Sequence, residues 1–334
     1  MSLRFRRSMK IAPGLRLNFS KSALGLSFGV PGARISVNTK GDVYTSAGLP
    51  GTGLYAVERR SLRKRKGRSK AKPELEPGDL AEPVKPPGLF APRRKVALYN
   101  ALRMGTVEEI AKVGAKYPEI KHIADAFIIP RQVSGTSTDI DGLTKTASEI
   151  WSKRSEMEQD ALFTENAKGM EVTLKIAPGV SFPMQYGITA LGLLYVELLQ
   201  LQGKFETALQ VAESLPANQA TGLSVCENEI RLGKWQEVID TTEDIENEDD
   251  ATALLLIYRA IAFREQGLFD AAIESLRLAR SAKKRHEDVL NQALFERAIT
   301  YEKQGKRANA RKELEKILAT DSDFPGVKEK LESL

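Results

Sequence analysis

The chain is poor in the residues that build most catalytic and metal sites. Its 334 residues include one cysteine, Cys226, and two histidines, His122 and His286. A single cysteine excludes an internal disulfide and is typical of a reducing compartment. The two histidines lie far apart, with no ligands around them at metal-binding spacing, so no metal site is expected.

Long apolar runs are also missing. No stretch of about 18 apolar residues occurs, so a membrane-spanning helix is not expected. The basic N-terminus is not followed by an apolar block, as it would be in a signal peptide. We therefore expect a cytoplasmic protein.

Sequence signatures of enzymes are absent as well. We find no nucleophile elbow, phosphate-binding loop or dinucleotide fingerprint. Ser61-Leu-Arg-Lys64 and Ser281-Ala-Lys-Lys284 match a Ser-x-x-Lys pattern that is common by chance and has no supporting partners here. The sequence predicts a protein without enzymatic activity or cofactor, in which the Cys226 thiol is a buried structural group.

Positive charge is concentrated at the start of the chain. Residues 1–72 contain 17 Lys and Arg against two acids, a net charge of +15. Because the whole chain carries +6, residues 73–334 carry −9. Nine of the positive charges lie between Arg59 and Lys72.

This basic run has two interpretations. It can be a solvated, disordered linker, or it can bind nucleic acid or an anionic membrane surface by counterion release. No aromatic residue is interleaved in it for stacking on bases, which favours the linker. The candidate contacts of the second interpretation are Arg59, Arg60, Arg63, Lys64, Arg65, Lys66 and Arg68.

Residues 1–57 alternate in the manner of short strands. Apolar residues recur at every second position from Leu15 to Phe19, from Leu24 to Phe28 and from Ile35 to Val37. Pro-Gly, Ser-rich and Gly-Asp segments suited to tight turns separate these runs. The sequence predicts a small antiparallel β meander with one buried face.

Several motifs in this segment resemble a known bacterial family. They include Arg4-Phe5-Arg6-Arg7-Ser8, Pro13-Gly14-Leu15-Arg16-Leu17-Asn18-Phe19 and Gly48-Leu49-Pro50-Gly51-Thr52-Gly53. In this order they resemble a family catalogued as a domain of unknown function, number 4236. The resemblance implies a bacterial source and an N-terminal module joined to varied partners, and it brings no activity or catalytic residues.

Composition then changes twice along the chain. Residues 58–92 combine the basic run with six prolines and are expected to form a linker. Residues 93–170 have helical periodicity, with a capping box at Thr106-Val-Glu-Glu109 and one long helix through Leu143 and Ala161.

Residues 171–184 alternate around Pro178-Gly179 and predict a β-hairpin. Its Lys175-Ile-Ala-Pro-Gly179 repeats Lys10-Ile-Ala-Pro-Gly14, which we interpret as reuse of one hairpin turn.

A repeat occupies residues 185–334. A glycine is followed two residues later by an aromatic in Gly203-Lys-Phe205, Gly233-Lys-Trp235 and Gly267-Leu-Phe269, and Gly305 begins a fourth copy. The spacings of 30, 34 and 38 residues indicate stacked helical hairpins. These units resemble tetratricopeptide repeats, most closely in the last two copies.

The predicted fold class is therefore multidomain α+β: an N-terminal β meander, a disordered linker, and a C-terminal helical repeat. Residues 184–334 should fold alone, because each repeat needs only its neighbours.

The resemblance implies a scaffold that binds another protein in a concave groove lined by the first helix of each hairpin. Residues two, three and six positions before each turn glycine should face that groove. We expect a basic clamp formed by Arg231 and Arg264 to hold a carboxylate of the partner. The groove candidates are Glu197, Gln200, Glu227, Arg231, Arg264, Glu265, Glu302 and Lys303.

Overall fold

The computed structural model describes residues 84–133, 139–282 and 284–334, together with the backbone of six strands between residues 7 and 61. The six strands pair antiparallel in chain order, which is the order of a meander. They are β1 (Arg7–Ala12), β2 (Leu15–Ser20), β3 (Ala23–Val30), β4 (Ala33–Asn38), β5 (Asp42–Gly48) and β6 (Tyr55–Ser61). Strand β6 therefore crosses the expected domain boundary after residue 57, and it includes Arg59 and Arg60.

The register of these strands follows the apolar alternation. Leu17 pairs with Leu26, and Leu26 with Val37. Because residues paired across a sheet share one face, the alternating apolar positions of β2, β3 and β4 all belong to the same face.

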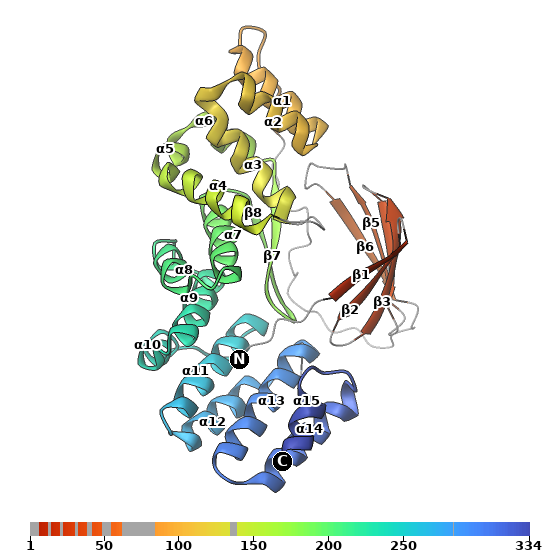
Figure 1. Cartoon of the computed structure of the whole chain (residues 1–334), viewed down its shortest axis with the longest axis vertical. Coiled ribbons are helices and arrows are strands. Elements are labelled where there is room, and N and C mark those ends of the chain that lie inside the picture. The colour runs from red at the N-terminus through yellow and green to blue at the C-terminus, as the bar shows by residue number, and fades with distance from the viewer. Residues whose placement is uncertain are drawn as a thin grey trace.

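Helices α1 to α6 follow, packed one upon another (Figure 1). The long helix expected through Leu143 and Ala161 is instead three helices, interrupted at Lys153 and Asp160. The Asp160 side chain accepts a hydrogen bond from the amide of Leu162 and so begins a new helix. The elements are α1 (Arg93–Met104), α2 (Val107–Lys116), the 3-10 helix η1 (Pro118–Ile120), α3 (Lys121–Val133), α4 (Ile140–Ser152), α5 (Arg154–Gln159) and α6 (Ala161–Ala167).

The hairpin predicted after these helices is present as β7 (Glu171–Ala177) and β8 (Val180–Gln185). Its register shifts between Lys175 and Ala177, and Ala177 then pairs with Val180. The same shift occurs between Lys10 and Ala12 in β1. The shared Lys-Ile-Ala residues thus show the same register shift in both strands, whereas residues 13 and 14 lie outside the described residues.

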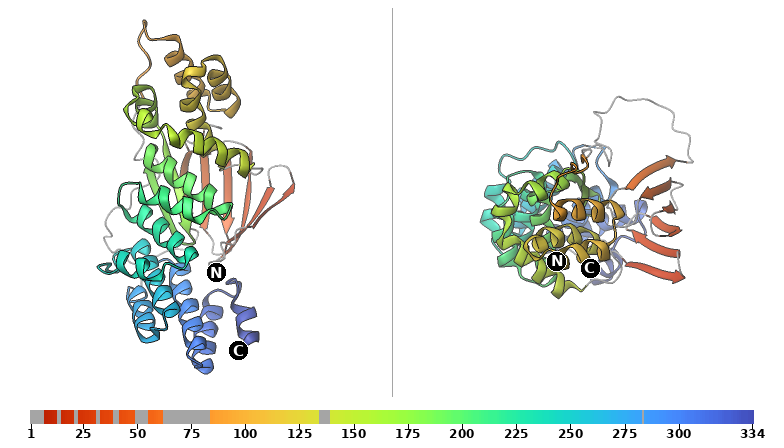
Figure 2. Two further views of the ribbon diagram at one scale, coloured as in Figure 1. Left: turned by 60° about the vertical axis from the view of Figure 1, so that its left-hand side comes forward. Right: turned by 90° about the horizontal axis from the view of Figure 1, so that it is seen from above.

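Four helical hairpins and a final helix follow among the described residues, and Figure 2 shows that the helices form one elongated array. The pairs are α7 (Ile188–Leu201) with α8 (Phe205–Glu213), α9 (Gln219–Leu232) with α10 (Trp235–Thr241), α11 (Asp250–Glu265) with α12 (Phe269–Ala279), and α13 (Glu287–Lys303) with α14 (Arg307–Thr320). Each turn glycine has a φ of 72–79°, a left-handed conformation that explains the recurrence of glycine. Helix α15 (Val327–Ser333) buries Val327 and covers the last unit.

The core does not divide where the repeats begin. One buried apolar cluster runs from Leu98 in α1 to Ala293 in α13. Trp151 of α4 packs so closely on α7 that a Cβ at Gly192 would lie 2.8 Å from its ring. The repeats and the preceding helices therefore share a core. This changes the expectation that residues 184–334 fold alone, since that fragment lacks the groups that cover α7.

Candidate partner-binding face

The β7–β8 hairpin lies on the first helices of the repeat. Leu174, Ile176 and Val180 are buried, whereas Lys175 between them is exposed. This alternation turns the apolar side of the hairpin toward the helices. Strand β7 contacts α7 and α9, and the three elements enclose a shallow depression. The depression is lined by Leu174, Lys175, Ile176, Leu193, Val196, Glu197, Gln200 and Ser224.

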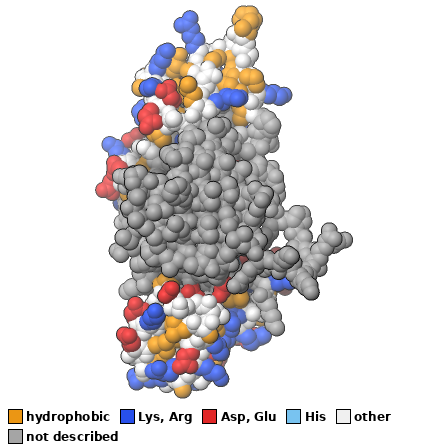
Figure 3. Space-filling model, turned by 90° about the vertical axis from the view of Figure 1, so that its right-hand side faces the viewer, with side chains coloured by type: hydrophobic (Ala, Val, Ile, Leu, Met, Phe, Trp, Pro, Cys, Tyr) orange, Lys and Arg blue, Asp and Glu red, His pale blue; other side chains and the backbone are white. Residues whose placement is uncertain are grey.

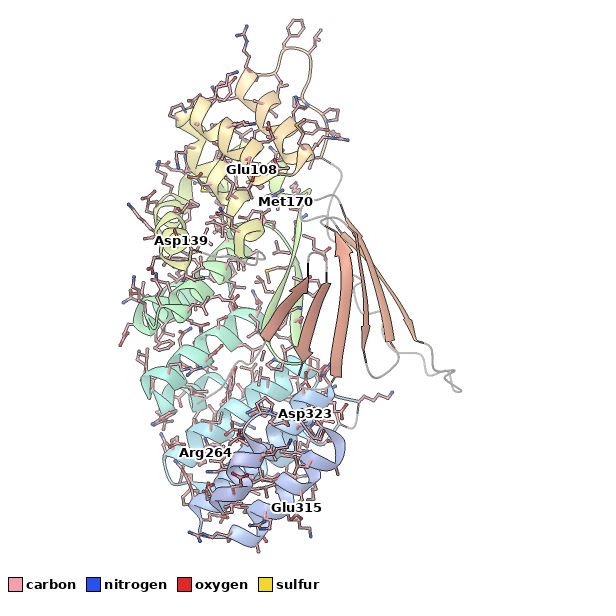
Figure 4. The ribbon with its side chains drawn as sticks, turned by 45° about the vertical axis from the view of Figure 1, so that its right-hand side comes forward. Glu108, Asp139, Met170, Arg264, Glu315 and Asp323 are labelled. Atoms are coloured by element: carbon pink, nitrogen blue, oxygen red, sulfur yellow. The ribbon has the colours of Figure 1, made fainter. Side chains whose placement is uncertain are left out.

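Contacts at both ends of the hairpin show how far it extends. At its base, the amide of Tyr186 donates to the carbonyl of Met170 (2.8 Å), and the Tyr186 ring packs on Phe127 of α3. Met170 lies where the hairpin leaves the upper helices (Figure 4). At its turn, a Cβ on Gly179 would lie 2.8 Å from Nδ1 of His286, the residue before α13. The hairpin thus connects the helices before the repeat with the fourth unit.

Four predicted groove residues, Glu197, Gln200, Glu227 and Arg231, lie on the helices that the hairpin contacts. Glu197 and Gln200 line the depression beside β7, and Glu227 of α9 is buried. The first two units therefore present a face already occupied by the chain's own extended segment.

Arg264 is placed differently from what the sequence indicated. Its side chain is only 7% exposed, and its Nη1 lies 2.6 Å from Oε2 of the equally buried Glu296 on α13. Burial opposes the charged form, but Glu296 and Glu265 together more than compensate, and the pKa of Arg264 is raised. The residue lies inside the lower half of the stack (Figure 4). Arg264 is a helix-to-helix contact, so it forms no clamp with Arg231.

Residues three positions before the other turn glycines also lie near neighbouring elements. Gln200 and Ser224 of α9 line the same depression, and Glu302 pairs with Lys330 of α15. Ile230 packs against the apolar core. Arg264 and Glu302 therefore join parts of the stack, whereas Gln200 lines the depression beside β7.

Positions two residues before each glycine are more accessible. Nζ of Lys303 donates to Oε2 of Glu265 over 2.6 Å, linking α13 to α11 at equivalent positions. Burial would raise the pKa of Glu265, but hydrogen bonds from Lys303 and Arg264 outweigh it, and the pKa is lowered. Glu265 is therefore held in its charged form.

Arg231 occupies the same position in the second unit and is exposed. Its guanidinium lies over the ring of Phe205, 5.7 Å from the centroid, and so contacts the first unit. We call Arg231, Glu265 and Lys303 the charged ridge. It alternates in sign along three successive first helices, and Leu201, 60% exposed, holds the equivalent place on α7.

Cys226, His122 and His286 belong to different elements, namely α9, α3 and the segment before α13. No group of three or more His, Cys, Asp and Glu among the described residues is arranged to hold a metal ion. Burial raises the pKa of Cys226, which keeps its thiol protonated. Burial, with a contribution from Lys153, lowers the pKa of His122 on α3, and His286 lies before α13.

Most of the basic residues proposed to bind an anionic partner lie outside the described part of the chain. Arg59 and Arg60 belong to β6, where Arg59 pairs with Tyr44 and Arg60 with Val43. Arg63, Lys64, Arg65, Lys66 and Arg68 lie outside the described residues.

Sequence reasoning missed two features of this face. It did not place Phe205 beneath Arg231, although the turn aromatic was recognised. It also did not place the hairpin on α7 and α9, because no local pattern specifies which helices a hairpin contacts.

The helical stack defines a class: it is a tetratricopeptide-like fold. The N-terminal domain of the EccA1 ATPase from the ESX-1 secretion system of Mycobacterium tuberculosis superposes with a TM-score of 0.53 at 16% identity, covering 72% of this chain and 88% of that one. A family model described as "Protein of unknown function (DUF4236)" matches residues 3–57. No curated protein matches the chain. No helix among the described residues is long and apolar enough to cross a membrane.

Proposed function

We propose that this protein is a non-enzymatic interaction scaffold that binds a segment of another protein across the first helices of units two to four. The fold supports an interaction role, since stacked helical hairpins present extended surfaces to partners. The observation that carries the proposal is the charged ridge. Arg231, Glu265 and Lys303 place accessible charges of alternating sign at matching positions on adjacent helices.

The hairpin supports the same proposal. Its Leu174 and Ile176 are buried and its strand β7 contacts α7 and α9, which supports binding of an extended segment with alternating apolar residues on these helices. A partner segment would lie along the charged ridge, with acidic groups opposite Arg231 and Lys303 and a basic group opposite Glu265. Charge-assisted hydrogen bonds would then set its register.

A peptide library displayed on phage and selected on the full-length protein tests this proposal. Peptides recovered should lose affinity for an Arg231→Glu/Lys303→Glu variant. An Arg311→Glu/Lys312→Glu variant carries the same charge change on the exposed side of α14 and should bind normally. Equal binding by both variants, with unchanged melting temperatures, would place the site away from the ridge.

The anionic-polymer interpretation of residues 59–72 stays a prediction. Titrating full-length protein with duplex DNA and with anionic vesicles, with and without neutralised Arg63 to Arg68, tests it directly. Binding that weakens steeply with salt and depends on these residues would support it.

A further inference from the structure

A tight apolar turn projects from the end of the molecule that carries α1. The amide of Ala91 donates to the carbonyl of Gly88 (3.0 Å) and closes the turn. Leu89 and Phe90 occupy its two central positions and are 94% and 97% exposed. No other large hydrophobic side chain among the described residues is as exposed. Figure 3 shows hydrophobic side chains at this upper tip, with Lys and Arg side chains nearby.

The turn has a fixed base. Val84 packs against Gly169, where a Cβ would lie 2.2 Å from the valine Cγ2. Pro86, Pro87 and Pro92 restrict the chain on both sides of the turn. The fold therefore holds two large apolar side chains in water in a restricted conformation, so little conformational entropy is lost when something covers them.

The surroundings of the turn carry charge of one sign. From Val84 to Val107 there are five cations and no acid. Lys95 pairs with Glu165, and Arg103 stacks on Tyr99.

The other three cations, Lys85, Arg93 and Arg94, are exposed close to the turn. Arg93 and Arg94 also stand in the first turn of α1, at the positive end of the helix dipole, where cations are unfavourable. The stability of α1 does not explain their presence.

We propose that this turn is a peripheral membrane anchor that inserts Leu89 and Phe90 into the surface of an anionic bilayer. The apolar side chains would enter the boundary between headgroups and acyl chains, while Lys85, Arg93 and Arg94 remain level with the lipid phosphates. Charge complementarity favours this occupant. Leucine adds nothing to base stacking, so the tip suits a membrane better than a nucleic acid.

A fluorescent probe at the tip measures insertion. Phe90→Cys can be labelled with an environment-sensitive dye, because the native Cys226 is buried and protonated. In full-length protein we expect a blue shift with phosphatidylcholine vesicles containing about 30% phosphatidylglycerol, and none with pure phosphatidylcholine. Leu268→Cys, on an exposed turn of the third unit, is the matched control and should not respond.

Vesicle sedimentation supplies the second measurement. Leu89→Ser/Phe90→Ser should weaken binding by roughly tenfold or more, since both side chains lose their apolar contact. Arg93→Gln/Arg94→Gln should weaken it and reduce its dependence on salt. Wild-type affinity in the serine variant would overturn the proposal and assign binding to another part of the chain, such as residues 59–72. A probe at position 90 that gives no blue shift would also overturn it. The turn would then be expected to bind in a pocket of another protein.

Discussion

Tyr186 completes the hydrogen bonding that Pro130 interrupts in α3. Proline has no amide hydrogen, so the carbonyl of Ala126, four residues earlier, lacks its usual helical donor. The hydroxyl of Tyr186, at the base of the hairpin, donates to that carbonyl. The next carbonyl, of Phe127, accepts from the guanidinium of Arg131. The hairpin is thereby joined to a defined defect in a helix sixty residues away in the sequence.

This relationship predicts the outcome of a double-mutant cycle. Tyr186→Phe keeps the ring contacts and removes only the donor, and it should lower the free energy of unfolding by about 1–2 kcal/mol. In a Pro130→Ala background the amide of residue 130 can serve Ala126, so the same change should cost less. Urea unfolding of the four proteins measures both costs. Equal costs in the two backgrounds would show that the hydroxyl does not compensate for the proline.

Arg264 and Arg231 should respond very differently to truncation. Arg264→Ala leaves Glu296 buried without its partner and should destabilise the protein by about 3–5 kcal/mol. Arg231→Ala removes an exposed cation–π contact and should cost under about 1 kcal/mol. Chemical denaturation of both variants checks the contrast. Adding Glu296→Ala to Arg264→Ala should restore part of the loss, and a failure to do so would contradict the buried ion pair.

Glu229 predicts a pH dependence of stability. Burial, reinforced by Glu237 and Glu213, raises its pKa to about 7 in the folded chain. The pKa of a glutamate in an unfolded chain is about 4.3. The folded state therefore binds the proton more tightly, and stability falls as pH rises between these two values. Glu229→Gln should be little changed at pH about 4.5 and more stable than wild type by about 1 kcal/mol at pH about 8.

Thermal melts at the two pH values, with the exposed Glu206→Gln as control, test the Glu229 prediction. A variant whose advantage is the same at both pH values would contradict it.

Truncation tests whether the helices form one cooperative unit. A fragment of residues 84–334 keeps α4 and the hairpin against α7, whereas residues 185–334 expose Ala190, Leu191 and Tyr195, which are buried in the full chain. We expect the longer fragment to melt cooperatively and remain monodisperse, and the shorter one to melt lower or aggregate. Circular dichroism and size-exclusion chromatography distinguish them. Equal stability would indicate that the repeats do not depend on the preceding helices.

The sequence was most informative where structure is local. Gly203, Gly233, Gly267 and Gly305 marked the turns, because each needs a left-handed backbone that glycine adopts without strain. Alternation around Pro178-Gly179 likewise identified the hairpin. The N-cap role of Asp160 is also a local signal, and the prediction of one long helix was wrong because it did not take this signal into account.

Contacts across many residues were not accessible in this way. Arg264 was correctly placed on the first helix of its unit, but its partner Glu296 is 32 residues away. Helical periodicity gives the angular position of a side chain and does not reveal which neighbour lies there. The depression at Glu197 depends on β7, whose docking is set by the packing of three separate elements.

The contact of Gly179 with His286 has a mechanical consequence. A solenoid whose units contact only their neighbours is flexible, because small movements at each interface add up along the stack. Here the hairpin spans from α3 to the start of α13 and so links units that are not neighbours in the stack. Bending that separates the first and fourth units must detach its turn. The distance between the first and fourth units is thus set by the length of β7 and β8 as well as by the interfaces between helices.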